Sequence, residues 1–170
     1  MSGLPLPPFW SMMAWGLVAT VAMTAILQGA QGLGLSRLSL PFLAGTFFTG
    51  DRRRAVIVGF GFYVVGGWLF AFLYFLLFAS LGLYAWWLGA LAGLLHGLFL
   101  LAAGLPLLPH IHPRMASEYD GATATRQLEP PGFMGLNYGH RTPLTTLIGQ
   151  AVYGAVLGGL PQLQGILQPG

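Results

Sequence analysis

Four stretches of the chain carry no charged side chain and are long and apolar. They cover residues 10–33, 55–80, 84–108 and 143–160 of a 170-residue sequence. A transmembrane helix needs about 20 mostly apolar residues. Charged residues make up 6% of the chain, against about 25% in soluble domains, so a charged, water-facing surface cannot be built. The pattern predicts an all-α fold: one transmembrane domain over residues 1–170, forming a polytopic bundle of four helices.

The segments between these stretches also carry structural signals. Residues 36–50 are apolar but broken by proline and glycine, which predicts a short interfacial segment before the second span. Residues 109–142 are the one long polar stretch and are expected to form a loop cap. No Lys or Arg precedes residue 10, so residues 10–33 are interpreted as a span and not as a signal peptide.

The distribution of arginine predicts the orientation. All seven cations are arginines, and they fall in the first and third loops of a four-span chain: Arg37, Arg52, Arg53, Arg54, Arg114, Arg126 and Arg141. The positive-inside rule places those loops in the cytoplasm. We therefore expect a multi-pass protein of the bacterial cytoplasmic (inner) membrane with both termini outside the cytoplasm. The triplet Arg52, Arg53 and Arg54 is expected to contact anionic lipid headgroups.

Composition and missing motifs exclude several functions. A net charge of +3 is too small for a basic nucleic-acid-binding face. The absence of cysteine excludes disulfides, thiolate metal sites and iron–sulfur clusters. There is no nucleophile elbow, Walker sequence, zincin helix or dinucleotide fingerprint. The chain is therefore expected to lack catalytic activity of its own.

His96 is the sharpest candidate functional residue because it is the one ionisable side chain other than tyrosine inside a predicted span. Such residues are costly in a bilayer and are functional candidates by default. One interpretation is a neutral imidazole hydrogen-bonded to another helix, through Gln150, Thr20, Thr24 or Tyr153. A second is a proton, ion or solute path that includes His96, Gln150 and Tyr153.

A third interpretation of His96 is an axial ligand to haem or chlorophyll. The motif Ala92-x-x-x-His96-Gly97 places a small residue one turn before the histidine, which leaves room for a flat macrocycle. It resembles the Ala-x-x-x-His pattern of bacterial light-harvesting antenna helices, which have a single span. The motif alone leaves the identity of the cofactor unknown.

Glycines at helical spacing predict close helix packing. Gly89, Gly93 and Gly97 form one small-xxx-small ridge, and Gly154 and Gly158 form a shorter one. The contact can lie within one chain or between chains. The latter possibility predicts a homo-oligomer or a subunit of a larger membrane complex.

The loop histidines offer a possible metal site. His110 and His112 lie between Pro109 and Pro113, and residues before proline favour extended backbone, in which positions i and i+2 face the same way. Glu118, Asp120 or His140 would complete a set suited to zinc or another transition metal. The alternative is a loop held by hydrogen bonds and ion pairs, in which three acids pair with three arginines: Glu118, Asp120 and Glu129 with Arg114, Arg126 and Arg141.

A set of short motifs is spread over about residues 42–160: Gly45-Thr46, Gly59, Tyr74, His96-Gly97, HPRMASE, LEPPG, GHRTPL and Tyr153-Gly154-x-x-x-Gly158. Together these motifs resemble a family of small, uncharacterised bacterial four-span inner-membrane proteins. The resemblance implies the fold and location, but no activity.

Three functions follow as expectations. The first is a structural or accessory subunit, or a homo-oligomer, in the lipid bilayer without nucleic-acid partners. The second is a small proton, ion or solute transporter that uses His96. The third is pigment, haem or metal binding through His96 or through His110 and His112.

Overall fold

The computed structural model describes residues 6–167, and of residues 160–167 it describes the backbone only. The described chain is helical, with two isolated bridges in the cap and no extended strand. The helices are α1 (Phe9–Gly32), α2 (Leu40–Thr46), α3 (Arg52–Leu81), α4 (Trp86–Phe99), α5 (Leu105–Ile111) and α6 (Thr142–Leu167). A π-helical segment η1 (Leu100–Gly104) joins α4 to α5, and a 3₁₀ segment η2 (Phe133–Tyr138) precedes α6.

Three helices among the described residues are long and apolar enough to cross a membrane: Phe9–Gly32, Arg52–Leu81 and the continuous Trp86–Ile111. This confirms an all-helical chain with membrane-spanning potential. Their outward sides carry large apolar residues such as Leu69, Leu95 and Phe99, each about 60% exposed or more (59%, 62% and 69%). A helix that is apolar all round belongs in a protein core or in lipid, so these exposed surfaces fit a lipid environment.

Capping residues mark the start of α2 and both ends of α3. The Asp51 carboxylate accepts a hydrogen bond from the Arg54 N–H at 2.8 Å and caps α3. Ser39 caps α2 in the same way through the Phe42 N–H at 3.4 Å. Gly82 ends α3 in the left-handed conformation at φ 65°, which costs glycine little.

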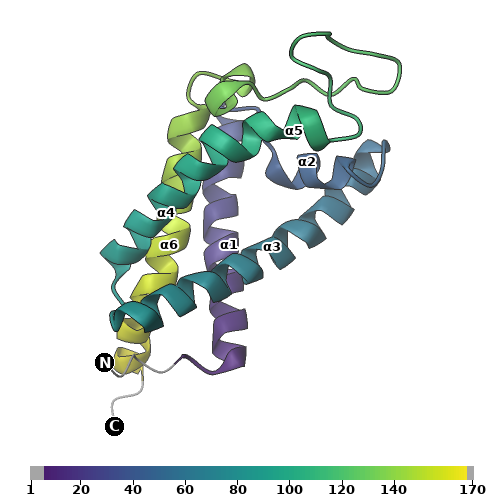
Figure 1. Cartoon of the computed structure of the whole chain (residues 1–170). Helices are drawn as coiled ribbons and strands as arrows, with labels where there is room; N and C mark the ends of the chain where they lie inside the picture. The colour runs from purple at the N-terminus through teal and green to yellow at the C-terminus, as the bar shows by residue number, and fades with distance from the viewer. Residues whose placement is uncertain (1–5, 168–170) are drawn as a thin grey trace.

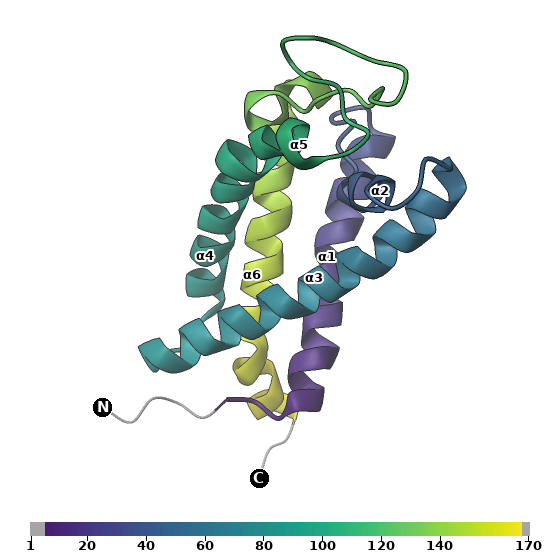
Figure 2. The same cartoon turned by 45° about the vertical axis from the view of Figure 1, so that its right-hand side comes forward.

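The four long helices divide into two groups. Figures 1 and 2 show α4, α6 and α1 running roughly side by side, while α3 crosses them obliquely. In both views α3 and α4 diverge from the turn that joins the end of α3 to the start of α4, and α2 lies between α3 and α5 at the end where they are far apart, the wide end. The loops at residues 33–51 and 112–141 lie at that same end, opposite the start of α1.

Glycine sets the closest helix contacts. A Cβ on Gly93 of α4 would lie 2.0 Å from the Gln150 carbonyl oxygen of α6, and one on Gly89 would lie 1.9 Å from the Gly154 oxygen. Gly158 faces the Ala85 oxygen at 2.3 Å, again measured from an added Cβ. The two glycine ridges therefore pack against each other within one chain, and Gly97 lies against the Gln150 side chain in the same seam.

A second seam of this kind joins α2 to α3. A Cβ on Gly45 would lie 1.7 Å from the Ala55 carbonyl oxygen, and one on Gly59 would lie 1.8 Å from the Pro41 oxygen. The expected interfacial segment thus forms a short helix that is fixed to the start of α3. This contact holds α2 in the gap between α3 and α5.

The loop cap differs from expectation at its start. Pro109, His110 and Ile111 are helical and belong to α5, so the extended backbone predicted for His110 is wrong. The π-helical segment before α5 and the two prolines of α5, Pro106 and Pro109, interrupt the regular hydrogen-bond ladder. The helix nevertheless continues past Pro109 to Ile111. The residue before Pro113, His112, is extended with ψ 121°, as the proline predicts.

The cap is held by arginine bonds to backbone oxygens. Arg114 donates to the Thr46 and Phe47 carbonyls at the end of α2, at 2.7 and 3.0 Å. Arg126 donates to the Met115 carbonyl at 2.6 Å and also to the Pro109 carbonyl. The predicted pairing of these arginines with loop acids is therefore wrong. The one ion pair formed by the described residues joins Arg37 to Glu129 at 3.0 Å.

Candidate functional site

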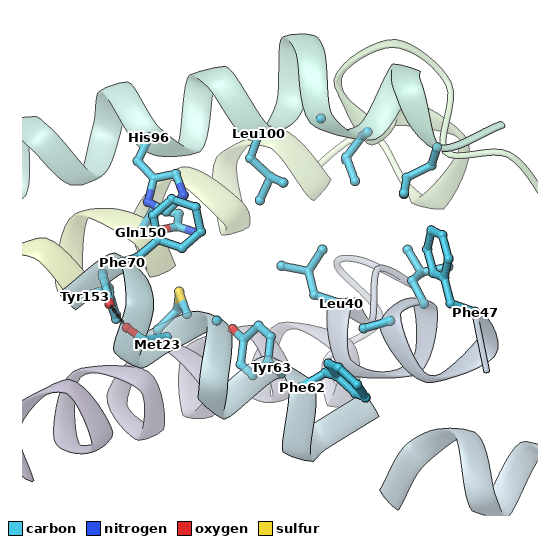
Figure 3. A pocket seen from close by; sticks show the side chains of 17 residues that line it. Met23, Leu40, Phe47, Phe62, Tyr63, Phe70, His96, Leu100, Gln150 and Tyr153 are labelled. Carbon is cyan, nitrogen blue, oxygen red and sulfur yellow. Dashed lines mark hydrogen bonds between the residues drawn. The ribbon is translucent and has the colours of Figure 1, made fainter. Parts of the chain in front are cut away.

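The divergence of α3 from α4 leaves a cavity of about 320 Å³ in the apolar part of the molecule. Figure 3 shows its two walls, with Phe62, Tyr63 and Phe70 of α3 facing His96 and Leu100 of the α4 side. Helix α2 lines the wide end, and α6 contributes residues at the narrow end. The lining is mostly aliphatic and aromatic, with a few polar groups. This is the usual character of small-molecule sites.

Three polar residues of the cavity are those that the sequence singled out as a ligand or proton path. His96, Gln150 and Tyr153 all line this one cavity, although they come from α4 and α6. Gln150 is 4% exposed, and its Oε1 atom has no hydrogen-bond partner in the part of the chain that the structure describes. An unsatisfied buried acceptor is rare in native proteins and calls for an explanation.

The hydrogen-bond partner of His96 is none of the four residues predicted from the sequence. Its Nδ1 atom lies 3.4 Å from the Tyr74 hydroxyl of α3, and not against Gln150, Thr20, Thr24 or Tyr153. The two threonines bond to carbonyls of their own helix, Thr20 to Gly16 and Thr24 to Thr20. The Phe70 ring lies against the imidazole with 4.2 Å between ring centroids. The imidazole is half-buried and directed into the cavity (Figure 3).

Tyr153 and Tyr63 complete the polar end. The Tyr153 hydroxyl is buried and donates to the Gly67 carbonyl of α3 at 2.5 Å. This bond connects α6 to α3 in the wall of the cavity. The Tyr63 hydroxyl makes no hydrogen bond of normal geometry. The Thr24 side chain lies near it, but the Thr24 hydroxyl already donates to the Thr20 carbonyl.

The π-helical segment forms part of the cavity wall. Leu100 and Gly104, its first and last residues, both line the cavity. Such segments occur often at functional sites, because the extra residue in the turn redirects side chains. The segment also lies between His96 and the wide end, so it shapes the path from the polar groups to α2.

The volume weighs against a haem or chlorophyll ligand on His96. A cavity of about 150 Å³ holds benzene, and this one holds about 320 Å³. A tetrapyrrole ring is several times larger than benzene. Ala92, one turn before His96, packs against the hydrophobic core and does not open a slot for a macrocycle.

The loop histidines do not form the expected metal site. His110 is exposed on α5, whereas His112 is 1% exposed. Both ring nitrogens of His112 are in use, since Nε2 lies 3.2 Å from the Leu43 oxygen and Nδ1 accepts the Arg114 N–H at 3.1 Å. No group of three potential ligands, His140 included, comes together among the described residues.

The arginine triplet lies at the exposed start of α3. Arg52, Arg53 and Arg54 are all exposed, and the Arg52 guanidinium lies 6.0 Å from the centre of the Phe42 ring of α2. They are free to face lipid headgroups at the end of the molecule that carries the loops.

Some cavity residues were not predicted to share a site. Tyr63 and Phe70 bring α3 to the cavity, and Leu40 and Phe47 bring α2. Tyr74 of α3 does not line the cavity but contacts His96, which does. The available signal was two tyrosines within a span otherwise lacking ionisable groups. Their spacing of 11 residues places them close to one helix face. Nothing in the sequence linked that face to His96.

No protein-family model, curated protein or solved structure matches this chain.

Proposed function

We propose that this protein is a small integral membrane protein that binds a lipophilic small molecule in the cavity between α3 and α4. The observation that carries the proposal is the cavity of about 320 Å³, whose lining is mostly apolar with a few polar residues such as His96, Gln150 and Tyr153. Small-molecule sites have this character. A lipophilic molecule that fills the apolar volume buries its own apolar surface and that of the lining.

Water alone does not account for this cavity. An ordered buried water needs two to four polar partners, and the lining offers few polar groups, gathered around His96 and Gln150. The remaining space, bounded by residues such as Leu100 and Phe62, is apolar. Space lined in this way favours an apolar molecule over water.

We further propose four spans with the loop end in the cytoplasm. Helix α6 has 26 residues, enough for about 39 Å at 1.5 Å per residue, and it packs along α4 through the glycine seam. All seven arginines belong to the loops and helix ends at one end of the molecule. The positive-inside rule supports a cytoplasmic location for that end, with both termini outside in a bacterial inner membrane. The sequence resemblance to small four-span proteins supports the same arrangement.

Cysteine labelling tests this orientation, because the chain has no cysteine of its own. Glu118→Cys places a thiol in the exposed cap, and Leu83→Cys places one in the turn between α3 and α4, where Leu83 is 43% exposed. In intact cells a membrane-impermeant maleimide is expected to label Leu83→Cys and to leave Glu118→Cys unlabelled until the membrane is permeabilised. Labelling of both positions from the same side would contradict four spans.

A cavity-filling variant tests ligand binding. A Cβ added to Gly66, which lines the cavity, meets no atom within 4 Å, so Gly66→Leu fills the space without a backbone clash. Gly61→Leu is the matched control, because Gly61 lies on the same helix, is exposed, also has open space and does not line the cavity. We expect purified wild type and Gly61→Leu to retain a lipophilic species that Gly66→Leu lacks.

The measurement is mass spectrometry of the protein purified in mild detergent, followed by solvent extraction of the bound material. The retained species is expected at near-stoichiometric amounts in wild type. Identical extracts from wild type, Gly66→Leu and Gly61→Leu would overturn the proposal.

The other expected functions relate to this proposal in different ways. The accessory-subunit or homo-oligomer role relied on glycine ridges as contacts between chains, and Gly89, Gly93 and Gly154 are already used within one chain. A transporter that uses His96 would pass its substrate through the same cavity. Binding in the cavity is therefore a step that the transporter function would share with the ligand-binding function proposed above.

A further inference from the structure

We infer that the ligand is a neutral lipophilic molecule with a carbonyl group, such as a long-chain ketone, whose oxygen accepts a hydrogen bond from His96 in the cavity. The inference rests on the proposed function and names the ligand class for that site. Two properties of the lining lead to it. The proton of His96 lies on the nitrogen that a ligand can reach, and the lining side chains offer no free acceptor.

The position of the proton on His96 follows from its partner, Tyr74. The Tyr74 side chain is buried, and its hydroxyl lies 3.4 Å from His96 Nδ1 with no other acceptor among the described residues. A buried phenol needs an acceptor for its proton, so the Tyr74 O–H donates to Nδ1. A neutral imidazole has a single N–H, and a charged one is costly at membrane depth. His96 therefore carries its proton on Nε2.

The Nε2–H group of His96 is available to a ligand. No residue in the described part of the chain bonds to Nε2, and Nε2 is not among the unpartnered polar atoms that the protein encloses. Figure 3 shows the ring nitrogens on the side of the imidazole that faces away from α4 and into the cavity. The Phe70 ring packs against the imidazole with 4.2 Å between ring centroids. A ligand therefore meets the nitrogen edge of the His96 ring.

The other polar side chains of the lining add a donor and no free acceptor. Gln150 Oε1 and the Tyr63 hydroxyl oxygen are enclosed by protein. The Tyr153 side chain is 1% exposed, and its hydroxyl is bonded to the Gly67 carbonyl. The Gln150 amide nitrogen is not enclosed in this way, and an amide nitrogen only donates. The polar group of a ligand in this cavity is therefore an acceptor.

A carbonyl suits such a lining better than other polar groups do. Its oxygen accepts hydrogen bonds and brings no proton of its own. A hydroxyl also accepts, but its proton stays unpaired in the cavity, which weakens binding. A carboxylate or ammonium brings a charge to membrane depth, which is costly.

The size of the cavity limits the rest of the ligand. Its volume of about 320 Å³ is about twice that of a cavity that holds benzene. It therefore accepts a molecule of about a dozen heavy atoms. A ketone with one alkyl chain of medium length has this size.

The test compares three tritiated probes of nearly equal shape on the full-length protein in mild detergent. They are 2-undecanone, 2-undecanol and 2-methylundec-1-ene, in which a CH₂ group replaces the carbonyl oxygen. Each dissociation constant is referred to the concentration of the probe in the micelles, so that differences in partitioning do not enter. Binding to Gly66→Leu, whose cavity is filled, defines the background. We expect the ketone to bind wild type about tenfold or more tightly than the alkene, and more tightly than the alcohol.

A variant assigns this preference to His96. His96→Phe keeps a planar ring and removes the N–H, so the ketone is expected to lose its advantage while the alkene binds as before. His110→Phe is the matched control, because His110 is exposed on α5 and does not line the cavity. It is expected to leave all three affinities unchanged.

Infrared spectroscopy detects the hydrogen bond directly. A donated hydrogen bond weakens the C=O bond, so the stretching band of bound 2-undecanone is expected at a lower frequency in wild type than in hexane. The band is recorded in a detergent without carbonyl groups and needs no substitution in the protein. In His96→Phe it is expected near its position in hexane.

The outcomes separate the inference from the proposed function. Saturable binding of the ketone and the alkene with equal affinity overturns the carbonyl assignment and leaves a lipophilic site, and so does an alcohol that binds as tightly as the ketone. A ketone preference that persists in His96→Phe, or a band at its hexane position in wild type, contradicts the bond to His96. Binding of all probes to wild type at no more than the Gly66→Leu background overturns the proposed function itself.

Discussion

Replacing Gly93 by alanine is expected to force α4 away from α6 and to remove most of the stability of the folded protein. The added Cβ would lie 2.0 Å from the Gln150 carbonyl oxygen and 3.0 Å from the Ala151 Cα. The obstacle is helix backbone, which cannot rotate away as a side chain can. Overpacking of this kind costs about 1–3 kcal/mol in ordinary cores, and we expect at least about 3 kcal/mol here because two backbones must separate.

The measurement is reversible unfolding of the purified protein in mixed micelles, followed by circular dichroism. Gly61→Ala is the control, since its added Cβ meets open space and alanine favours a helix over glycine by about 1 kcal/mol. It is expected to leave stability unchanged or slightly raised. Equal stability of Gly93→Ala and Gly61→Ala would show that α4 and α6 do not meet through this seam.

Replacing His112 by alanine is expected to detach the loop cap from α2, with a loss of about 3 kcal/mol. His112 is 1% exposed. Its Nε2–H faces the Leu43 oxygen at 3.2 Å and the Thr46 hydroxyl at 3.1 Å, and Nδ1 accepts the Arg114 N–H. The Phe47 ring packs against the imidazole with 4.1 Å between centroids. Removal leaves the Arg114 N–H without its acceptor beside a void, while the Thr46 hydroxyl keeps its bond to the Leu43 oxygen.

His112 also predicts a pH dependence. Burial holds the pKa of His112 below its ordinary 6.5, the bond to the Leu43 oxygen opposes this, and the Arg114 and Arg126 guanidiniums lower the pKa further. The unfolded chain therefore binds the proton more readily than the folded one. The stabilisation is fully present above about pH 6.5 and is lost as the pH falls through the lower pKa of the folded state.

The pH effect is measured as the Tm of the protein between pH 7.5 and pH 5. Wild type is expected to lose stability on acidification, and His112→Ala, already less stable, is expected to show a flatter profile. His110→Ala is the control, since His110 is exposed on the neighbouring turn, and it should behave as wild type does. A wild-type slope that persists unchanged in His112→Ala would contradict this role.

Much of the helical layout was predictable from local sequence. The helices expected over residues 10–33, 55–80 and 84–108 are α1, α3 and the continuous helix from Trp86 to Ile111. Helix formation in apolar stretches follows from backbone hydrogen bonding within each stretch, and proline and glycine mark the breaks. The same local signals misplaced the start of the cap, because the π-helical turn at Leu100–Gly104 has no simple sequence signature.

The candidate site was predictable in its members but not in its geometry. His96 was a clear candidate because an ionisable group in an apolar span is rare. Gln150 and Tyr153 were predicted to lie on the same ligand or proton path. Its hydrogen bond to Tyr74 was missed. That contact depends on the angle at which α3 crosses α4, and the sequence of either helix alone does not specify a crossing angle.

The helical character of the chain, its suitability for a bilayer and the gathering of its arginines in two loops follow from residues near one another in the sequence. The packing of the glycine ridges within one chain and the position of α2 beside α3 are visible only in the folded molecule. The same is true of Gln150, which lines a cavity while its Oε1 atom has no partner among the described residues. Backbone contacts such as Gly93 with Gln150 and Gly59 with Pro41 set the helix tilts, and the tilts determine which distant side chains meet.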